Sequence, residues 1–572
     1  MTQETESDIN GKQDRSPFLR RRLPLLAILL FATIGNLVWI ATHAAPYFNT
    51  LNCEIPTIEM IQQAPLKAIV EFIKFGSIPF PTGYHFVAAL VTSLIGYSAD
   101  KLIFTSTLFY LLLILAVYDI VRSLANERGA AAAAITVALI PGVFAWSRIF
   151  SLSSSISSMT IPALGVWAAV RSEGFSKNAP TVAFGLTVIL ALRFGSAVSD
   201  FWQNFVVLGL VGLYTLIQGA VTRRRNQRRT FLLIACATVV LVLLSKTTFF
   251  QYSVQYLYQE GVSEAGDRYR QSNLLYSPQS LFAYCWYLWK VLLNPFFALA
   301  TVAASVFLLR RLDRREAISF IYFWATLALF SVIGKKNFSY IFCLLPGAAV
   351  IIGLAIGRLR RTALFLCVMA VIVAIGGWQY VRYSYFLTNR QSVISSSYSR
   401  FFDDLPIQAP HLPRSDFYAP DQIARELAAE KRLLNLWVIA GKQDMDAMAF
   451  RCLIQIYDRR REVHVFPPPR GEHPPQSSIA KMPAALPNPP DVIVSFIQPA
   501  GRPNHLLGTA ADQTLPAPTT TPNQTIPTIH DKQLRQHFAA TDLSRYKQQI
   551  YSFRSPYSNM ENALSIFRPR DN

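Results

Sequence analysis

Charged residues are scarce in this chain of 572 residues: Asp, Glu, Lys and Arg together make up 15% of it, whereas soluble domains contain about 25%. The mean hydropathy of +0.28 also argues against an ordinary water-soluble protein. The six cysteines are scattered, without a CxxC pair or the spacing of a metal site, so no metal-binding motif is expected. These shortages indicate a membrane protein.

The formal net charge of +20 raises the question of a nucleic-acid partner. Most of the basic residues, however, flank apolar blocks, where Lys and Arg set the orientation of a membrane protein. We therefore expect membrane lipids among the partners, and no nucleic acid.

Long apolar blocks dominate residues 23–383, and most are long enough to cross hydrocarbon as a helix, which takes roughly 17–25 residues. The blocks are 23–44, 101–121, 129–147, 201–220, 230–249, 282–309, 316–334, 338–357 and 362–383, with two weaker ones at 155–170 and 180–197. The sequence predicts an α-helical polytopic membrane protein with about eleven transmembrane helices.

The distribution of basic residues predicts the topology. From Arg122 onward, two apolar blocks separate each basic cluster from the next, as expected when every cluster lies in the cytoplasm. Between Arg22 and Arg122 there are three apolar stretches, so the shortest, residues 82–97, is expected to lie on the outer surface as a juxtamembrane helix. Residues 1–22 then form a cytoplasmic tail, and 45–100 form an outer loop.

Residues 384–572 are more polar and are predicted to form a soluble α/β domain on the periplasmic or extracellular side, for packing or acceptor recognition. No nucleotide-binding glycine loop occurs in it. Residues 467–528 are rich in proline, threonine and asparagine, which is typical of a loop. A helix is expected at Asp444–Tyr457, and strands at Leu434–Ala440, Val463–Phe466, Asp491–Phe496, Gln548–Phe553 and Ala563–Phe567.

Short motifs recur along residues 20–380 in a characteristic order. They are Pro79-Phe80-Pro81-Thr82-Gly83-Tyr84-His85, Tyr118-Asp119-Ile120-Val121-Arg122, Leu139-Ile140-Pro141-Gly142, and Gly334-Lys335-Lys336-Asn337-Phe338-Ser339-Tyr340 followed by Leu344-Leu345-Pro346. This pattern resembles the GT-C superfamily of membrane glycosyltransferases, in particular the protein mannosyltransferase and aminoarabinose transferase branch.

The resemblance implies a helical bundle in the bacterial inner (plasma) membrane with a membrane-level active site that opens outward. The donor would be a sugar on a polyprenyl phosphate or diphosphate, and the acceptor a lipid, glycan or protein. Transfer would invert the anomeric carbon, and an acidic residue of the first outer loop would act as the base.

Glu54 takes the place of that acidic residue, and Glu59 is the second candidate for the base. A carboxylate at the lipid–water boundary suits this role, because partial desolvation raises its basicity. The family usually has Asp at this place, and its second acidic residue has no counterpart in the serine-rich loop 150–158. Asp200 could substitute for it. An ordinary loop carboxylate is the alternative reading of Glu54.

Cations near the outer ends of the spans are candidates for binding the donor phosphate. They are Lys335, Lys336, Arg148, Arg193 and Lys246. Lys335 and Lys336 also match the basic residue of the family motif. Basic side chains that reach the interface from a helix end are the alternative explanation.

Tyr84, His85 and Tyr340 are the predicted substrate-binding residues. Sugar rings stack on aromatic faces, and His85 could orient a carboxylate. An interfacial aromatic belt would explain the aromatic residues equally well. Some relatives use a divalent cation held by paired acidic residues. Since this chain lacks the second acid, no metal and no cofactor are expected.

Two other functions remain open from the sequence. A member of the family that has lost activity could serve as a binding or assembly subunit, which the serine-rich loop favours. A transporter for lipid-linked glycans would need charges within its spans or paired broken helices.

Overall fold

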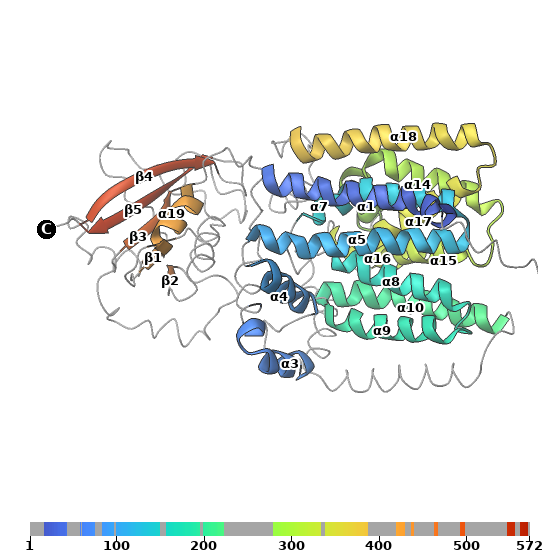
Figure 1. Cartoon of the computed structure of the whole chain (residues 1–572), viewed down its shortest axis with the longest axis horizontal. Helices are drawn as coiled ribbons and strands as arrows, with labels where there is room; N and C mark the ends of the chain where they lie inside the picture. The colour runs from blue at the N-terminus through green and yellow to red at the C-terminus, as the bar shows by residue number, and fades with distance from the viewer. Residues whose placement is uncertain are drawn as a thin grey trace, which may run out of the picture.

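The computed structural model describes most of the transmembrane region and parts of the C-terminal region. The described residues are 16–42, 58, 60–74, 83–96, 99–148, 156–194, 198–221, 278–332, 338–386, 419–429, 436–439, 463–466, 492–497, 546–554 and 561–569. Figure 1 shows a bundle of helices and, beyond the end of the bundle near α4 (Gly83–Ile95), a β-sheet.

The bundle is built from apolar helices. The helical segments are α1 (Ser16–Thr42), α3 (Pro65–Lys74), α4 (Gly83–Ile95), α5 (Ala99–Leu124), α6 (Glu127–Leu139), α7 (Pro141–Trp146), α8 (Ser157–Ser172), α9 (Asn178–Phe194), α10 (Val198–Val221), α13 (Pro278–Tyr287), η2 (Leu288–Leu292), α14 (Asn294–Leu309), α15 (Ala317–Phe320), η3 (Ile321–Ala325), α16 (Thr326–Val332), η4 (Phe338–Leu344), α17 (Leu345–Gly357), α18 (Thr362–Val381) and η5 (Arg382–Phe386). The segments η2, η3 and η5 are π-helical turns, and η4 is a 3₁₀ helix.

Within the described residues, five helices are long and apolar enough to cross a membrane, or six if one bent pair counts as a single span. The chain is therefore a multi-pass α-helical membrane protein, as predicted. Ten of the eleven predicted apolar blocks contain helix, and the block 230–249 lies outside the described residues. The exact number of crossings stays a prediction.

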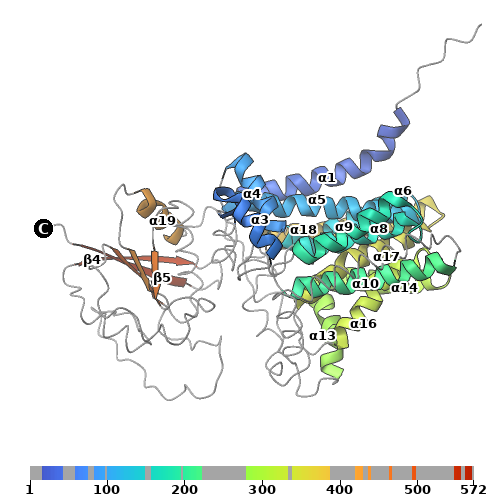
Figure 2. The same ribbon diagram turned by 90° about the horizontal axis from the view of Figure 1, so that it is seen from below.

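The block 282–309 was expected to be one span, and in the structure it is bent, as a broken span or a re-entrant loop would be. It consists of two helices, Leu281–Lys290 and Asn294–Leu309, that meet at an angle of 116°. Pro295 has no N–H to donate and disfavours helical backbone at the residue before it, and Asn294 adopts a φ of 65°, which Asn tolerates better than most residues. Figure 2 shows α13 turned away from the direction of α14.

Within the short stretch 82–97, residues Gly83–Ile95 form α4, which has 13 residues. At about 1.5 Å per residue it spans about 20 Å, less than the roughly 30 Å of hydrocarbon in a bilayer. One face of α4, including Tyr84 and Ala88, is buried in the main hydrophobic core. The length of α4 supports the prediction that it does not cross the membrane.

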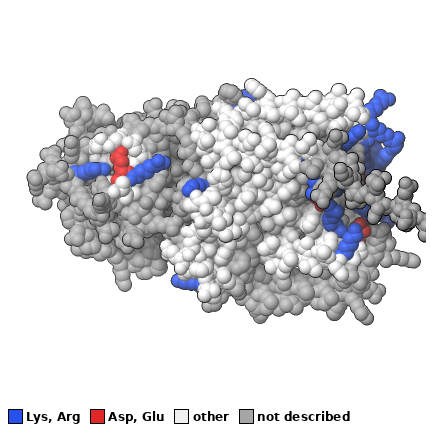
Figure 3. All heavy atoms as spheres, viewed as in Figure 1, with Lys and Arg blue, Asp and Glu red and all other residues white. Residues whose placement is uncertain are grey.

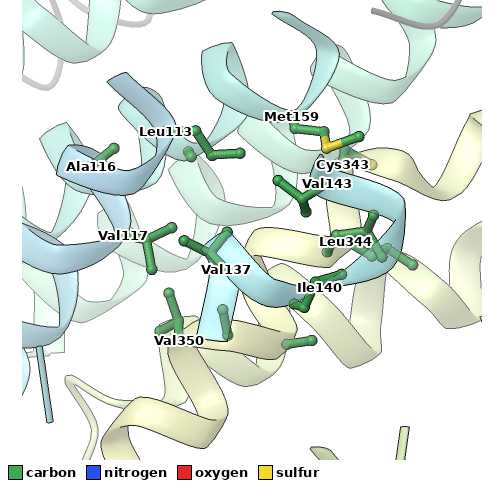
Figure 4. Packing of buried hydrophobic residues seen from close by; sticks show 14 of the residues in the cluster. Leu113, Ala116, Val117, Val137, Ile140, Val143, Met159, Cys343, Leu344 and Val350 are labelled. Atoms are coloured by element: carbon green, nitrogen blue, oxygen red, sulfur yellow. The ribbon is translucent and has the colours of Figure 1, made fainter. Parts of the chain in front are cut away.

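The alanine-rich α6 lies against α17 almost backbone to backbone. A Cβ added at Gly353 would lie 2.5 Å from the Cβ of Ala133 and 2.8 Å from the carbonyl oxygen of Gly129. Small residues permit such close approach between membrane helices, where van der Waals packing drives association. Figure 4 shows the centre of this packing, where Val137 of α6 lies near Val117 of α5 and Val350 of α17.

Basic residues gather at one end of the bundle, the end away from the sheet (Figure 3). Ion pairs hold several of them there: Arg171 Nη2 lies 2.5 Å from Asp119 Oδ2, and Arg122 Nε lies 2.8 Å from Glu127 Oε1. Arg358 pairs with the buried Glu316. The described basic clusters therefore share one side, as the topology requires, and the assignment of that side to the cytoplasm stays a prediction.

The C-terminal strands lie where the sequence predicts them. They are β1 (Leu436–Ile439), β2 (Val463–Phe466), β3 (Val492–Ile497), β4 (Tyr546–Arg554) and β5 (Glu561–Pro569). The sheet order is β2-β1-β3-β5-β4, with β1 parallel to β2 and β3, and β5 antiparallel to β3 and β4. The preceding helix α19 (Ala419–Ala429) buries Ile423, Ala424 and Leu427. The predicted helix Asp444–Tyr457 lies outside the described residues, and an independent domain stays a prediction.

Replacing Gly353 by Ala should destabilise the bundle, because the new methyl group would have to push α6 and α17 apart. Overpacking of this kind costs about 1–3 kcal/mol, so the thermal midpoint measured in detergent should fall. The control is Gly209→Ala in α10, where an added Cβ meets nothing within 4 Å. That variant should be neutral or gain up to about 1 kcal/mol from helix propensity. Equal midpoints for the two variants would contradict the close crossing.

Candidate functional site

Four of the predicted site residues have described side chains: Arg148, Tyr84, His85 and Tyr340. Arg193 lies in α9, but its side chain is not among those described. The remaining predicted residues, Glu54, Glu59, Lys246, Lys335 and Lys336, lie outside the described residues, as does most of the first outer loop. Their roles stay predictions.

Arg148 follows α7 after one intervening residue, Ser147, and is almost completely buried, with 1% of its surface exposed. The chain enters α6 at the basic end of the bundle, beside Arg128, and reaches Arg148 after α7. Arg148 therefore lies toward the opposite end, which the predicted topology would place on the outer side. Arg148 is one of the five cations predicted near the outer ends of the spans, and its burial distinguishes it from a side chain that reaches the interface.

The guanidinium of Arg148 is held by two neutral hydrogen-bond acceptors from distant segments. Nε donates to Asn36 Oδ1 of α1 at 3.2 Å, and Nη1 donates to Ser384 Oγ of η5 at 2.6 Å. Nη2 has no hydrogen-bond partner among the described residues. A guanidinium has five N–H donors, so the described chain leaves part of its capacity unused.

Three aromatic rings surround the same group. The ring centroids of Tyr380, Phe144 and Trp39 lie 4.8, 5.3 and 5.7 Å from Cζ of Arg148. Such contacts contribute from about 0.5 to 2 kcal/mol each, most when the cation is desolvated. They stabilise the positive charge without neutralising it.

No ion pair among the described residues involves Arg148. A buried cation without a counter-charge is costly, and charged residues within membrane proteins commonly mark a functional site. The free edge of a guanidinium matches the oxygens of a phosphate or carboxylate, with which it can form two parallel hydrogen bonds. The arrangement around Arg148 is therefore suited to binding an anion.

Tyr84 lies in the contact between α4 and α5, and the neighbouring His85 is buried. The hydroxyls of Tyr84 and Ser106 are 2.7 Å apart, and the ring of Tyr84 lies 5.3 Å from that of Phe109. Burial lowers the pKa of His85 to about 3, so its ring is neutral at physiological pH. Tyr84 packs α4 onto α5, and a contact with substrate stays a prediction for both residues.

Tyr340 is the first residue of η4 whose side chain is described, and 8% of its surface is exposed. In the same segment, the ring of Phe342 packs on Trp146 of α7, with centroids 4.9 Å apart. The segment that carries Tyr340 therefore lies beside α7, which leads to Arg148. Its proposed contact with a sugar stays a prediction.

Sequence analysis missed Asn36 and Ser384. Asn36 carries an amide within the apolar block 23–44, and a polar residue inside a span is itself a signal of an interhelical hydrogen bond. Ser384 lies just past the last block and has no comparable signal. The partner of either residue could not be read from the sequence. No group of three metal-binding side chains occurs among the described residues.

Residues 80–250 match the family of dolichyl-phosphate-mannose-protein mannosyltransferases. The match confirms, over these residues, the resemblance to the mannosyltransferase branch of the GT-C membrane glycosyltransferases. The matched range runs from α4 beyond α10 and includes Arg148. No curated protein matches the sequence significantly.

Solved structures give distant likenesses. The crystal structure of ArnT from Cupriavidus metallidurans bound to undecaprenyl phosphate is 14% identical, with a TM-score of 0.47 over 95% of this chain and 97% of that one. Its apo form has a TM-score of 0.44 at 15% identity, over 77% of this chain and 85% of that one. The archaeal oligosaccharyltransferase AglB from Archaeoglobus fulgidus, in complex with an inhibitory peptide and a dolichol-phosphate, is 12% identical, with a TM-score of 0.40 over 79% and 65%.

Lowering the pH should destabilise the protein through His85. Its pKa in the folded protein lies below the ordinary value of 6.5, so the unfolded chain binds the proton more tightly and folding stability falls as the pH drops below about 6.5. Between about pH 7 and pH 5 the loss should reach about 2 kcal/mol, and the His85→Gln variant should escape it. Thermal midpoints of both proteins at the two pH values measure the difference. The same pH dependence in both would show that His85 is not buried as described.

Proposed function

We propose that this chain is a glycosyltransferase that moves a sugar from a polyprenyl-phosphate donor to a lipid, glycan or protein acceptor at the outer face of the bacterial inner membrane. The observation that carries the proposal is the buried guanidinium of Arg148, which has neutral protein partners and an unpartnered Nη2 among the described residues. The family match of residues 80–250 supports the donor class.

The chemistry of the donor explains the need for such a group. When the glycosidic bond to a polyprenyl phosphate breaks, negative charge develops on the phosphate oxygens. A fixed cation in a site that excludes water stabilises that charge more strongly than water does. Arg148 is fixed and desolvated, and we assign it to this role, with Lys335 and Lys336 as further cations.

Transfer to a hydroxyl also requires a base near the acceptor oxygen. Glu54 follows α1 by a short segment of chain, and α1 carries Asn36, the partner of Arg148. A base just beyond the outer end of α1 would stand on the same side of the membrane as the donor phosphate. We assign the proton-accepting role to Glu54, with Glu59 as the second candidate.

One observation favours a different function. The serine-rich segment 150–158 lacks the carboxylate that the family has in its second outer loop. A chain that has kept the donor site and lost this second carboxylate could bind the lipid-linked sugar without transferring it. Such a protein would serve as a binding or assembly subunit.

Removing the guanidinium should weaken binding of a polyprenyl phosphate. For undecaprenyl phosphate titrated into the protein in lipid nanodiscs, Arg148→Gln should lower the affinity by about 10- to 100-fold, since hydrogen bonds to charged groups contribute about 1.5–3 kcal/mol. Arg148→Lys should lose less, because the charge remains and the fork geometry is lost. The control is Arg171→Gln, which removes an arginine paired with Asp119 at the basic end. Unchanged affinity in Arg148→Gln would exclude the proposed role.

Removing the base should lower turnover and leave donor binding nearly unchanged. Glu54→Gln keeps the shape of the side chain and removes the proton acceptor, so turnover should fall by about 10²–10⁴-fold. Glu59→Gln should have a smaller effect. The measurement is glycan transfer under single-turnover conditions. If Glu59→Gln or Asp200→Asn abolishes transfer instead, the base is misassigned. If none of the three matters, the binding-subunit function takes the place of the enzyme.

A further inference from the structure

Arg148 depends on a side chain of the first helix for its orientation. We propose that Asn36 is a positioning residue: it fixes the guanidinium of Arg148 through a neutral hydrogen bond and leaves both its charge and Nη2 available to the donor phosphate. This inference rests on the proposed donor-binding role of Arg148.

The amide of Asn36 has only one orientation that satisfies its surroundings. Nδ2 donates to Thr107 Oγ1 of α5 at 3.1 Å and to Ser147 Oγ at 3.2 Å, with the Ser147 carbonyl oxygen at 3.4 Å. A reversed amide would place its NH₂ group against the Nε–H of Arg148, donor against donor. Oδ1 must therefore face Arg148, and α5 and the end of α7 hold it there.

The network around Asn36 is itself fixed. Ser147 Oγ donates to the Phe144 carbonyl oxygen at 2.7 Å, and Thr107 Oγ1 donates to the Ile103 carbonyl oxygen at 3.1 Å. Asn36, Thr107 and Ser147 are all buried. Hydrogen bonds in a buried and satisfied network restrict motion more than isolated surface bonds do. The position of Asn36 Oδ1 is thus determined by three segments of the bundle.

The second acceptor, Ser384, is held in a similar way by its neighbours in η5. Tyr383 OH accepts a hydrogen bond from Asn294 Nδ2 at 2.5 Å, at the break between α13 and α14. Tyr385 OH donates to the Gly35 carbonyl oxygen at 3.5 Å, next to Asn36 in α1. The hydroxyl of Ser384 therefore stands between two anchored residues, and Nη1 of Arg148 points to it.

Both side chains that accept hydrogen bonds from Arg148, Asn36 and Ser384, are neutral, so they leave its charge uncompensated. At the basic end, Arg171 and Arg358 are held by carboxylates, which compensate their charge. A carboxylate at position 36 would hold Arg148 at least as firmly, since charge-assisted hydrogen bonds are stronger than neutral ones. It would also neutralise the cation, and the attraction for a phosphate would fall. Asn36 holds the guanidinium through a hydrogen bond and, being neutral, does not reduce its charge.

The Asn36→Asp variant tests whether a neutral side chain at position 36 is needed for binding of the phosphate. In lipid nanodiscs titrated with undecaprenyl phosphate, this variant should lose affinity by at least about tenfold while its thermal midpoint stays unchanged or rises. The salt dependence of binding should also weaken, because an internal carboxylate replaces part of the interaction between Arg148 and the phosphate. A residue with only a structural role would change affinity only together with stability.

The matched control is Thr33→Val, one turn earlier in α1, which removes the Thr33 hydroxyl that donates to the Leu29 carbonyl oxygen without touching the network. It should bind as the wild type does. If Asn36→Asp does not fold, Thr107→Val serves instead: it removes the acceptor of Nδ2 with little change of shape and should lower the affinity by a few-fold. Wild-type affinity in that folded variant would then count against the proposal.

The reference variant Arg148→Gln distinguishes a failure of the positioning role of Asn36 from a failure of the donor-binding role of Arg148. If Arg148→Gln binds weakly and Asn36→Asp binds normally, the positioning role of Asn36 is wrong and the donor-binding role of Arg148 stands. If Arg148→Gln binds normally, both fail. In the double variant, Asn36→Asp should cause no further loss, because the group that it acts through is gone. Additive losses would show that Asn36 acts independently of Arg148.

Discussion

The close crossing of α6 and α17 is the contact on which the arrangement of the bundle depends. Gly129, Ala133 and Gly353 bring the two backbones together, and nothing larger fits between them. Lipid is as apolar as a leucine side chain, so membrane helices gain little from burying apolar surface against one another. They gain from close packing instead. α7 and Arg148 follow α6 in the chain, so the crossing that fixes α6 also limits where they can lie.

The arginines at the two ends of the bundle have different hydrogen-bond acceptors, charged at one end and neutral at the other. At the basic end, Asp119 and Glu316 accept hydrogen bonds from Arg171 and Arg358, so the cations are compensated within the chain. Toward the other end, Arg148 is buried among aromatic rings, and its two described acceptors are neutral. The first arrangement suits the fixing of helix ends, and the second suits an external anion. This contrast within one molecule is the physical basis of the proposed function.

Two irregularities of the main chain meet near the same place. The break at Asn294 and the π-helical turn η5 are joined by the hydrogen bond between Asn294 and Tyr383. Gly35, whose missing side chain leaves room for the Tyr380 hydroxyl, lies one residue before Asn36. Departures from regular α-helix frequently accompany functional sites. Here they place Ser384 and the Tyr380 ring around Arg148.

Hydropathy and charge alone determined the class of this protein, the ranges of most helices, the gathering of basic clusters on one side and the positions of the five C-terminal strands. These features are local: a run of apolar residues forms a helix in lipid whatever its neighbours are, and alternating β-branched residues form strands. The break in 282–309 was missed because hydropathy does not report backbone angles, although Pro295 was a visible signal.

Only the tertiary structure decided that Arg148 is buried and which side chains hold it. The sequence offered Arg148 as one of five candidate cations, among which the family motif favoured Lys335 and Lys336, and Asn36 and Ser384 lie 112 and 236 positions away from it in the chain. Hydrogen bonds between such distant side chains follow from how the helices pack. No local pattern records that packing, because a residue's neighbours across a helix crossing are set by the shapes of both helices together.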